Sequence, residues 1–382
     1  MKRAVFSYLD GERRDHPGND VLDEAKVNLV IGLGDKTALA DSTFYTKLHQ
    51  DYPNAEIVLC STAGEIFDDS VQDSSVSVTA VEFEKTLARS AVVDIKDFNG
   101  CSYEAGKALI GNLMAFDDLS YILVFSDGSQ VNGSELVNGV NSQVQGKVPV
   151  TGGLAGDGAA FQSTLVGLNA QPGHGQIVAI GLYSKNLEVS HGSMGGWESF
   201  GPERTITRSK ANQLFVIDDE SALDLYKKYL GPYAKELPGS ALLFPLMVRL
   251  SGDEEPVVRT ILSIDEASRS MFFAGDVPEG ASVRFMKANY DRLVDAASTA
   301  ANQALTEQCS TRPSLSILIS CVGRKIILAG RVAEEVEAVK EVFGDKTLIT
   351  GFYSYGEIAP PFAGTPCQLH NQTMTITNLS ER

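Results

Sequence analysis

A cysteine at the end of an apolar segment is the first residue in this sequence whose type and position could carry chemistry. Cys60 ends such a segment and is followed by Ser61, Thr62 and a Gly64-Glu65 turn, a setting that resembles a nucleophile elbow. A catalytic thiol also requires a base, usually histidine, and none of the five histidines stands in a recognisable partner motif. A Cys60-dependent amidase or thiol transferase is therefore one alternative, and a small buried side chain is the other.

The C-terminal third of the chain holds the richest group of polar and aromatic side chains. Arg324 follows an apolar segment, where a guanidinium can bind a carboxylate through two hydrogen bonds. Polar and aromatic groups at strand ends are typical of a small-molecule pocket rather than of a catalytic centre. We expect Arg324 to bind an anionic group of the ligand; the structural alternative is that it pairs with Glu357. The expected ligand-binding residues are Cys321, Arg324, Tyr353, Tyr355, Glu357, His370 and Asn371.

Three segments share one local pattern, in which an apolar run and a few small or aromatic residues are followed by glycine and an acid. The three turns are Gly64-Glu65, Gly156-Asp157 and Gly356-Glu357, and each comes after an earlier apolar run that ends in glycine. The intervening stretches have helical character; in 332–343, apolar residues recur at i, i+4, i+7 and i+11. The pattern predicts an α/β fold with mixed sheets, built from repeated strand–helix–strand units in two related halves. Residues around the first two turns are secondary ligand-binding candidates: Cys60, Ser61, Thr62, Glu65 and Asp157.

The length of 382 residues is sufficient for two or three domains. The stretch from His191 to Ser209 contains four glycines, a proline and the single tryptophan, and it is predicted to form neither a helix nor a strand. We therefore expect an N-terminal α/β domain at residues 1–205 and a C-terminal, ligand-binding α/β domain at residues 206–382. Within the second domain, residues 222–230 and 288–309 are predicted helices, and 257–264 reads as strand.

The charge and hydropathy of the chain exclude several classes of partner. The formal net charge is −17, which opposes binding to nucleic acid and to anionic membrane surfaces. No apolar stretch approaches the roughly 18 residues needed to span a bilayer, and the N-terminus lacks the apolar core of a signal peptide. The five cysteines include no C-x-x-C pair. We expect a cytoplasmic protein with reduced thiols and no membrane insertion.

The chain also resembles the FIST family of sensory proteins over nearly its whole length. Five runs in the order of the family's motifs carry the resemblance: 60–66, 151–157, 320–324, 351–358 and 369–373. The resemblance implies a FIST N-terminal-like domain followed by a FIST C-terminal-like domain. It also implies a sensor of a small ligand rather than an enzyme. Such a sensor would relay ligand occupancy to a separate signalling partner, such as a histidine kinase or a cyclic-dinucleotide enzyme.

The resemblance implies two kinds of ligand. One branch of the family binds haem and senses nitric oxide, and for that branch His370 and His191 are the candidate axial ligands, since histidine is the usual ligand of haem iron. No C-x-x-C-H attachment motif is present, so haem would be held non-covalently. The other expectation is a small, amino-acid-like molecule.

Overall fold

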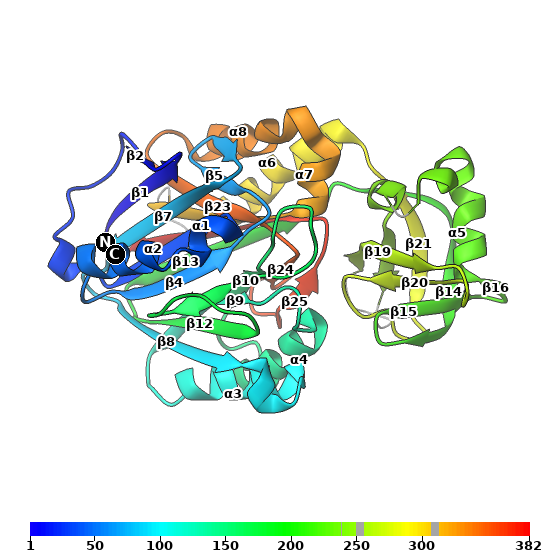
Figure 1. Cartoon of the computed structure of the whole chain (residues 1–382), viewed down its shortest axis with the longest axis horizontal. Helices are drawn as coiled ribbons and strands as arrows, with labels where there is room; N and C mark the ends of the chain where they lie inside the picture. Colours follow the sequence, from blue (N-terminus) through cyan, green and yellow to red (C-terminus); the bar gives the residue numbers. More distant parts are fainter. Residues whose placement is uncertain (238, 250–255, 307–312) are drawn as a thin grey trace.

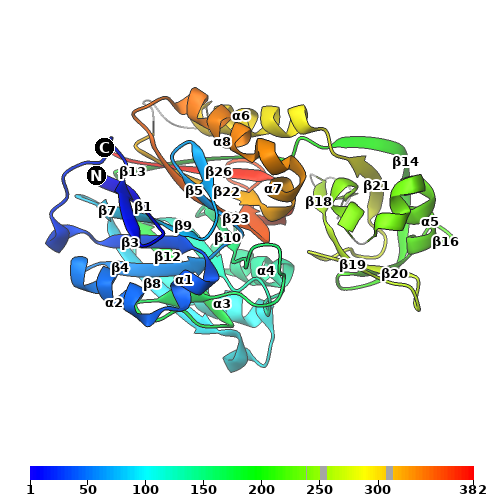
Figure 2. The same cartoon turned by 45° about the horizontal axis from the view of Figure 1, so that its top comes forward.

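The computed structural model describes residues 1–237, 239–249, 256–306 and 313–382, and it confirms the predicted mixed α/β fold. The chain forms a large body and a smaller inserted domain, which lies on the right of Figure 1. The body contains residues 1–194 and 290–382, and the inserted domain contains 198–287. The two termini lie side by side on the side of the body away from the inserted domain (Figures 1 and 2).

Three strand–helix–strand units make up the body, as the repeated sequence pattern predicts. In each unit the two strands are parallel neighbours, and helices connect them. The parallel pairs are β3 (Leu29–Gly34) with β4 (Glu56–Ser61), β9 (Leu119–Ser126) with β10 (Val150–Leu154), and β22 (Leu315–Cys321) with β23 (Leu348–Ser354). The connecting helices are α1 (Lys36–Ala40), α2 (Ser42–Asp51), α4 (Gly133–Val144), α7 (Val322–Leu328) and α8 (Val332–Phe343). The N-terminal half thus holds two such units and the C-terminal half one.

Helix α8 shows why these local patterns form helices. Its apolar residues Val336, Val339 and Phe343 are fully buried on one face, as the period of the pattern predicts. The predicted helix in 222–230 is confirmed as α5 (Ala222–Leu230), which begins at the N-cap Ser221 and ends at Gly231.

Each parallel pair also receives a strand from another unit. β5 (Glu65–Phe67), which follows β4, pairs with β23; β24 (Gly356–Ala359), which follows β23, pairs with β10; and β11 (Val166–Leu168), which follows β10, pairs with β4. The three units therefore exchange their exit strands in a cycle. The C-terminal unit belongs to the same body as the two N-terminal units, so this body contains strands from both 1–205 and 206–382.

An antiparallel pair of strands completes each of the three sheets. These pairs are β7 (Ser75–Glu82) with β1 (Lys2–Leu9), β12 (Gln176–Tyr183) with β8 (Leu87–Asp94), and β26 (Met374–Glu381) with β13 (Leu187–Met194). Further elements of the body are β2 (Glu12–Asp15), β6 (Ser70–Gln72), β25 (Gln368–His370), α3 (Ser102–Leu113) and α6 (Tyr290–Thr306). The predicted helix at 288–309 corresponds to α6, and Cys309 lies outside the described residues.

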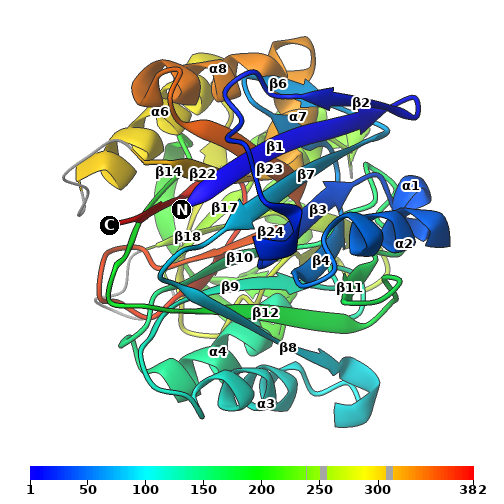
Figure 3. The same ribbon diagram turned by 90° about the vertical axis from the view of Figure 1, so that its left-hand side faces the viewer.

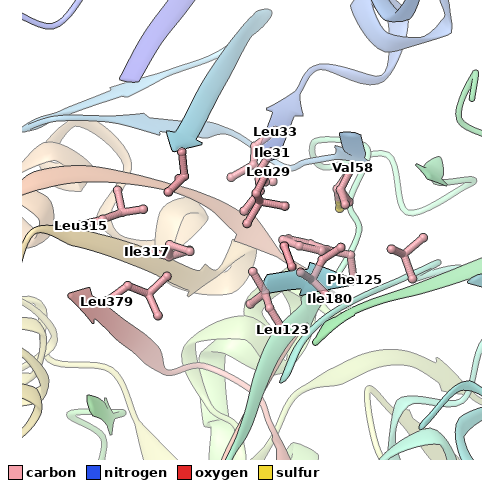
Figure 4. Close-up of a cluster of buried hydrophobic side chains, with 14 of the residues drawn as sticks. Leu29, Ile31, Leu33, Val58, Leu123, Phe125, Ile180, Leu315, Ile317 and Leu379 are labelled. Carbon is pink, nitrogen blue, oxygen red and sulfur yellow. The ribbon is translucent and has the colours of Figure 1, made fainter. Parts of the chain in front are cut away.

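The core of the body lies between the three sheets. Leu29 and Ile31 from the first sheet meet Leu123 from the second, and Leu315 and Ile317 from the third (Figure 4). Helices cover the outer faces (Figure 3): α1 and α2 on one side, α3 and α4 on another, and α6 and α8 on the third. Burial of one apolar face per sheet in a shared core makes the three units interdependent.

The inserted domain has a hydrophobic core of its own. Its strands are β14 (Glu198–Lys210), β15 (Gln213–Ile217), β16 (Glu220–Ser221), β17 (Leu246–Arg249), β18 (Val257–Arg259), β19 (Ile261–Asp265), β20 (Ser270–Phe273) and β21 (Ser282–Lys287), and α5 packs against them. The stretch 191–209, predicted to be irregular, is largely strand, because β13 pairs with β26 and β14 with both β15 and β21. Tertiary pairing overrides the weak local propensity of the glycines. None of the described helices is long and apolar enough to cross a membrane.

Candidate functional site

A cavity of about 290 Å³ lies where the inserted domain meets the body. The body lines it with residues that follow β9, β10 and β22, such as Ser129, Phe161 and Val322. The inserted domain lines it with residues around β19 and β20, including Thr260 and Ala274. The carboxyl ends of parallel strands are a common place for ligand sites, because the connecting loops gather there. The volume is close to the lower end of the range for small-molecule pockets.

A buried aspartate positions the loop between β9 and α4 at the edge of this cavity. Oδ1 of Asp127 accepts hydrogen bonds from the backbone N–H of Ser129 at 2.7 Å and of Gln130 at 2.7 Å, and from Oγ of Ser129 at 2.8 Å. Oδ2 of Asp127 accepts from the N–H of Gly175 at 2.9 Å. Asp127 is a loop-holding residue that the sequence analysis did not single out, although it follows a predicted strand.

Tyr355 is one of two predicted ligand residues that line the cavity. Its hydroxyl donates to the carboxylate of Asp157 and accepts from the N–H of Asp157 at 3.1 Å and of Phe161 at 3.0 Å. The rings of Phe161 and Tyr355 stack with centroids 4.7 Å apart. Burial raises the pKa of Tyr355 above its usual range, so the phenol is neutral. Asp157 and Tyr355 thus hold the loop that brings Phe161 to the cavity.

Cys321 is the other predicted residue that lines the cavity. Burial raises the pKa of its thiol well above the usual value, so it is present as the neutral thiol. It lies at the end of β22, where its backbone N–H donates to the carbonyl of Thr373 at 3.1 Å. A protonated thiol is a weak hydrogen-bonding group rather than a nucleophile.

The lining of this cavity carries no Asp, Glu, Lys, Arg or His among the described residues. Its polar groups are hydroxyl, amide and thiol groups, together with the phenol of Tyr355. Thr260 is 4% exposed, and its Oγ1 has no hydrogen-bond partner in the part of the chain that the structure describes. Buried hydroxyl groups are nearly always hydrogen-bonded, so Thr260 is an unsatisfied polar side chain in the wall of the cavity.

Arg324 does not offer the free guanidinium that the sequence analysis expects. Its Nε and Nη2 donate to Oε2 of Glu335 at 2.9 and 2.7 Å, and both side chains are fully buried. Its Nη1 donates to the carbonyl of Gly195 at 2.6 Å, and Nη2 also donates to that of Leu293 at 2.7 Å. The partner of Arg324 is therefore Glu335, and neither Glu357 nor an exposed anion. Tyr353 is fully buried too, and its hydroxyl donates to Glu335 at 2.6 Å.

The bonds of Arg324 also hold both connections to the inserted domain. Gly195 lies in the segment between β13 and β14, and Leu293 lies in the first turns of α6, after β21. Nearby, Nε1 of Trp197 donates to the carbonyl of Gln372 at 2.9 Å. The Arg324–Glu335 pair thus stabilises the two segments of the chain that lead into and out of the inserted domain.

Glu357 is a buried carboxyl group at the start of β24, and its hydrogen bonds are all made within the protein. It accepts hydrogen bonds from Oγ of Ser354 at 2.6 Å, and from the N–H and Oγ1 of Thr373 at 3.2 and 2.9 Å. Burial, only partly offset by these hydrogen bonds and by the charge of Arg324, raises the pKa of Glu357 to about 8. At neutral pH Glu357 is therefore largely protonated.

Glu65 is held in the same way in the first unit. It accepts from Oγ1 of Thr62, and from the N–H and Oγ of Ser75 at 3.2 and 2.7 Å. Burial raises the pKa of Glu65 to about 7. In both units, the acid of the Gly-acid pair is therefore hydrogen-bonded to the start of a later antiparallel strand. Glu65 binds the start of β7, and Glu357 binds Thr373, which directly precedes β26. In the second unit Asp157 instead binds Tyr355, and so reaches the edge of the cavity.

His370 and Asn371 lie away from the lining of the cavity. Nε2 of His370 is 3.0 Å from the carbonyl oxygen of Ala359, and burial lowers the pKa of His370 to about 4. The histidine is therefore neutral at pH 7. Asn371 is fully buried, and its amide nitrogen and oxygen have no hydrogen-bond partner within the described residues.

Cys60 and Ser61 have structural roles in the body: Cys60 is part of its core, and Ser61 links two of its units. Cys60 is fully buried, its Sγ is 3.4 Å from the carbonyl of Ser61, and burial raises the pKa of the thiol. These features are opposite to those of a catalytic cysteine, which corrects the nucleophile alternative. Oγ of Ser61 donates to the carbonyl of Gly156 at 2.7 Å and accepts from the N–H of Leu165 at 2.8 Å, joining two units.

The residues expected to hold haem do not fit that group. Nε2 of His370 already contacts a backbone carbonyl, and His191 is buried in β13 opposite Thr377 of β26. No histidine lines the cavity among the described residues. The described part of the chain also contains no cluster of three or more residues that could hold a metal ion.

The inserted domain supplies the part of the cavity that the sequence analysis missed. Asn212, Thr260 and Phe273 line it from strands or turns of that domain. These residues stand in no recognisable motif, so no local signal could have selected them. Their position depends on how the inserted domain packs on the body.

Two family models place the chain among the sensory domains of signal transduction. The FIST N domain matches residues 28–220, and the FIST C domain matches residues 222–360. The chain therefore belongs to the FIST family. The two matches meet inside the inserted domain, between β16 and α5.

Comparisons with individual proteins show only distant similarity. No curated protein matches the chain. A chorismatase crystal structure is 13% identical, with a TM-score of 0.39, and the match covers 99% of this chain and 98% of the chorismatase chain. A cyanuric acid hydrolase from A. caulinodans is 9% identical, also with a TM-score of 0.39, and the match covers 94% and 92% of the two chains. Similarity at this level does not indicate an activity for this protein.

Proposed function

We propose that this FIST protein is a cytoplasmic sensor that binds a small, uncharged ligand in the cavity between the body and the inserted domain. The observation that carries the proposal is the composition of the lining. It comes from both parts of the molecule, and it combines apolar side chains with uncharged polar groups. A ligand in this position contacts both parts at once, so that its presence can influence their arrangement.

The chemistry of the lining supports an uncharged ligand rather than the amino-acid-like molecule expected from the family resemblance. An amino acid carries a carboxylate and an ammonium group, and burial of charges without charged or strongly hydrogen-bonding partners is unfavourable. The hydroxyl of Thr260, which has no partner among the described residues, and the side-chain amide of Gln162 suit the hydrogen-bonding groups of a neutral molecule. The rings of Phe161 and Phe273 and the side chain of Val322 suit its apolar surface.

Signalling follows from differential affinity for two arrangements of the inserted domain. A ligand shifts such an equilibrium only if it binds one arrangement more tightly. Contact with Thr260 on one side and with Ser129 or Tyr355 on the other favours the arrangement in which the two sides are close. The changed surface then signals to a separate partner, such as a histidine kinase or a cyclic-dinucleotide enzyme.

An enzymatic function has weaker support. The candidate nucleophile Cys60 and the thiol that lines the cavity, Cys321, are both buried and have raised pKa values. A thiol reaction needs a base near the sulfur, and among the described residues none of those lining the cavity is a histidine or a carboxylate.

Filling the cavity tests the proposal. Ala274→Phe places a ring in the lining, whereas Ala267→Phe adds the same ring at an exposed position of the inserted domain. Small molecules released by denaturing the purified proteins are identified by mass spectrometry and are then titrated by calorimetry. We expect the wild type and Ala267→Phe to bind a neutral compound, and Ala274→Phe to lose at least tenfold in affinity. Equal affinity in all three proteins would remove the cavity as the ligand site.

A further inference from the structure

A second cavity, of about 620 Å³, lies at the same interface between the body and the inserted domain. The body lines it with residues of α4, including Ser134 and Asn138, and with the segment 361–369. The inserted domain contributes Arg259, at the end of β18, and Asp276. This second cavity has a cationic side chain in its wall, whereas none of the described residues that line the first cavity is cationic.

Arg259 is buried (2% exposed), and none of the described carboxylates forms an ion pair with it. Its Nε donates to the carbonyl of Asp276 at 3.1 Å, and its Nη1 donates to those of Leu369 at 2.9 Å and Val258 at 3.4 Å. In the described part of the chain, Nη2 of Arg259 has no hydrogen-bond acceptor. Buried guanidinium groups are otherwise found paired with anions.

In the part of the chain that the structure describes, the charged and titratable groups around Arg259 do not provide that anion. The carboxylate of Asp276 influences Arg259 electrostatically, but its Oδ1 accepts from Nδ2 of Asn132 at 3.3 Å rather than from the guanidinium. His370 is the other titratable neighbour and is neutral at pH 7. Although burial lowers the pKa of Arg259 to about 10, the guanidinium remains positively charged at neutral pH.

We propose that the second cavity is an anion-binding site in which Arg259 binds the carboxylate or phosphate group of a ligand. The uncommitted Nη2 supplies a charge-assisted hydrogen bond, which is stronger than a bond between neutral groups. Oγ of Ser134 accepts from the N–H of Asp276 at 3.1 Å, which leaves its hydroxyl hydrogen free to donate to the anion. An anion bound here joins α4 to the inserted domain. The site does not depend on a ligand in the first cavity.

Titration of the intact protein with an anion tests the inference. Inorganic phosphate and, separately, acetate are added at constant ionic strength, and binding is followed by calorimetry. The net charge of the chain is −17, so its overall charge does not attract anions, and saturable binding reports a local site. Saturation by phosphate alone indicates a phosphate group on the natural ligand, and saturation by acetate indicates a carboxylate. Either result supports the site.

Three variants locate the binding. Arg259→Gln removes the charge and should weaken anion binding at least tenfold. Asn138→Asp leaves Arg259 and its hydrogen bonds in place but adds a competing carboxylate to the cavity wall, and it should also weaken binding tenfold or more. Arg269→Gln removes an exposed arginine of the same domain, which pairs with Asp224, and should leave the affinity unchanged.

The outcomes separate this site from a merely structural arginine. If neither anion binds saturably to the wild type, the inference fails. It also fails if Arg259→Gln is folded and binds as tightly as the wild type. If Arg259→Gln does not fold, Asn138→Asp decides, since unchanged affinity in that variant would exclude the cavity.

Discussion

Arg324 and Arg259 are two buried arginines in opposite electrostatic situations. Arg324 in the body is fully buried against Glu335, with further bonds to Gly195 and Leu293. Arg259 in the inserted domain is nearly as buried, but within the described residues it contacts only backbone carbonyl groups. The first arginine closes a network that holds the fold together. The second lines a cavity, and its Nη2 has no hydrogen-bond acceptor among the described residues. Both guanidinium groups are buried, so burial does not distinguish them. A carboxylate partner marks Arg324 as a structural residue, and the lack of one among the described residues makes Arg259 a candidate binding residue.

Removing the carboxylate partner of Arg324 leaves both arginines without an ion pair among the described residues. This change should lower the free energy of unfolding more than the other changes below. Glu335→Ala leaves a buried guanidinium without its carboxylate, and such changes typically cost about 3–5 kcal/mol. The hydroxyl groups of Tyr353 and Ser320 also lose their acceptor. Urea denaturation monitored by circular dichroism should show this loss of the free energy of unfolding.

The neighbouring Glu334 provides the matched control for this variant. Glu334 pairs with Arg331 on the surface of α8, and an exposed pair contributes only about 0–1 kcal/mol. Glu334→Ala should therefore be nearly as stable as the wild type. A Glu335→Ala variant as stable as Glu334→Ala would contradict the contrast between the two arginines.

Glu357, which lies within the electrostatic influence of Arg324, should make stability fall as the pH rises. Its pKa is raised from 4.5 to about 8, mainly by burial, so the folded protein retains a proton that the unfolded chain has released. Between pH 4.5 and 8 this one group lowers the free energy of unfolding by up to about 1.4 kcal/mol per pH unit. Glu357→Gln should reduce the difference in stability between pH 5 and pH 8, measured by urea denaturation. An unchanged pH dependence would show that Glu357 titrates normally.

His370, which lies within the influence of Arg259, should act in the opposite direction and by a smaller amount. Burial, together with the charge of Arg259, lowers the pKa of His370 from 6.5 to about 4. Its contribution to stability is complete above pH 6.5 and is lost as the pH falls towards 4. His370→Gln should flatten the acidic side of the stability curve between pH 6.5 and 4.5. If the variant and the wild type lose stability in parallel, His370 is not a buried neutral group.

The helices and the three repeated units could be predicted because their signals are local. The apolar stripe in 332–343 determines α8, and the N-cap Ser221 and the C-cap Gly231 bound α5. All of these signals act between residues within a few positions of one another. The Gly-acid turns mark where the strands of each unit end. The same reasoning did not find β14, because Gly201 and Pro202 predict a loop and its pairing with β21 involves residues far along the chain.

The candidate site could be predicted only in part, for a related reason. Tyr355 and Cys321 were recognised from their positions at strand ends, and both line the first cavity. Arg324 also follows the end of a strand, but its guanidinium forms an ion pair with Glu335 of α8 and does not line the cavity.

The amino-acid sequence by itself thus determined the class of fold, the repeated units and the family. The tertiary structure decided that 198–287 forms an inserted domain, which arginine has a carboxylate partner, and where the two cavities lie. The physical reason is the range of the interactions. Helix periodicity and turn preferences act between neighbours in the chain, whereas burial, ion pairing and cavities depend on side chains that only the packing of the whole molecule brings together.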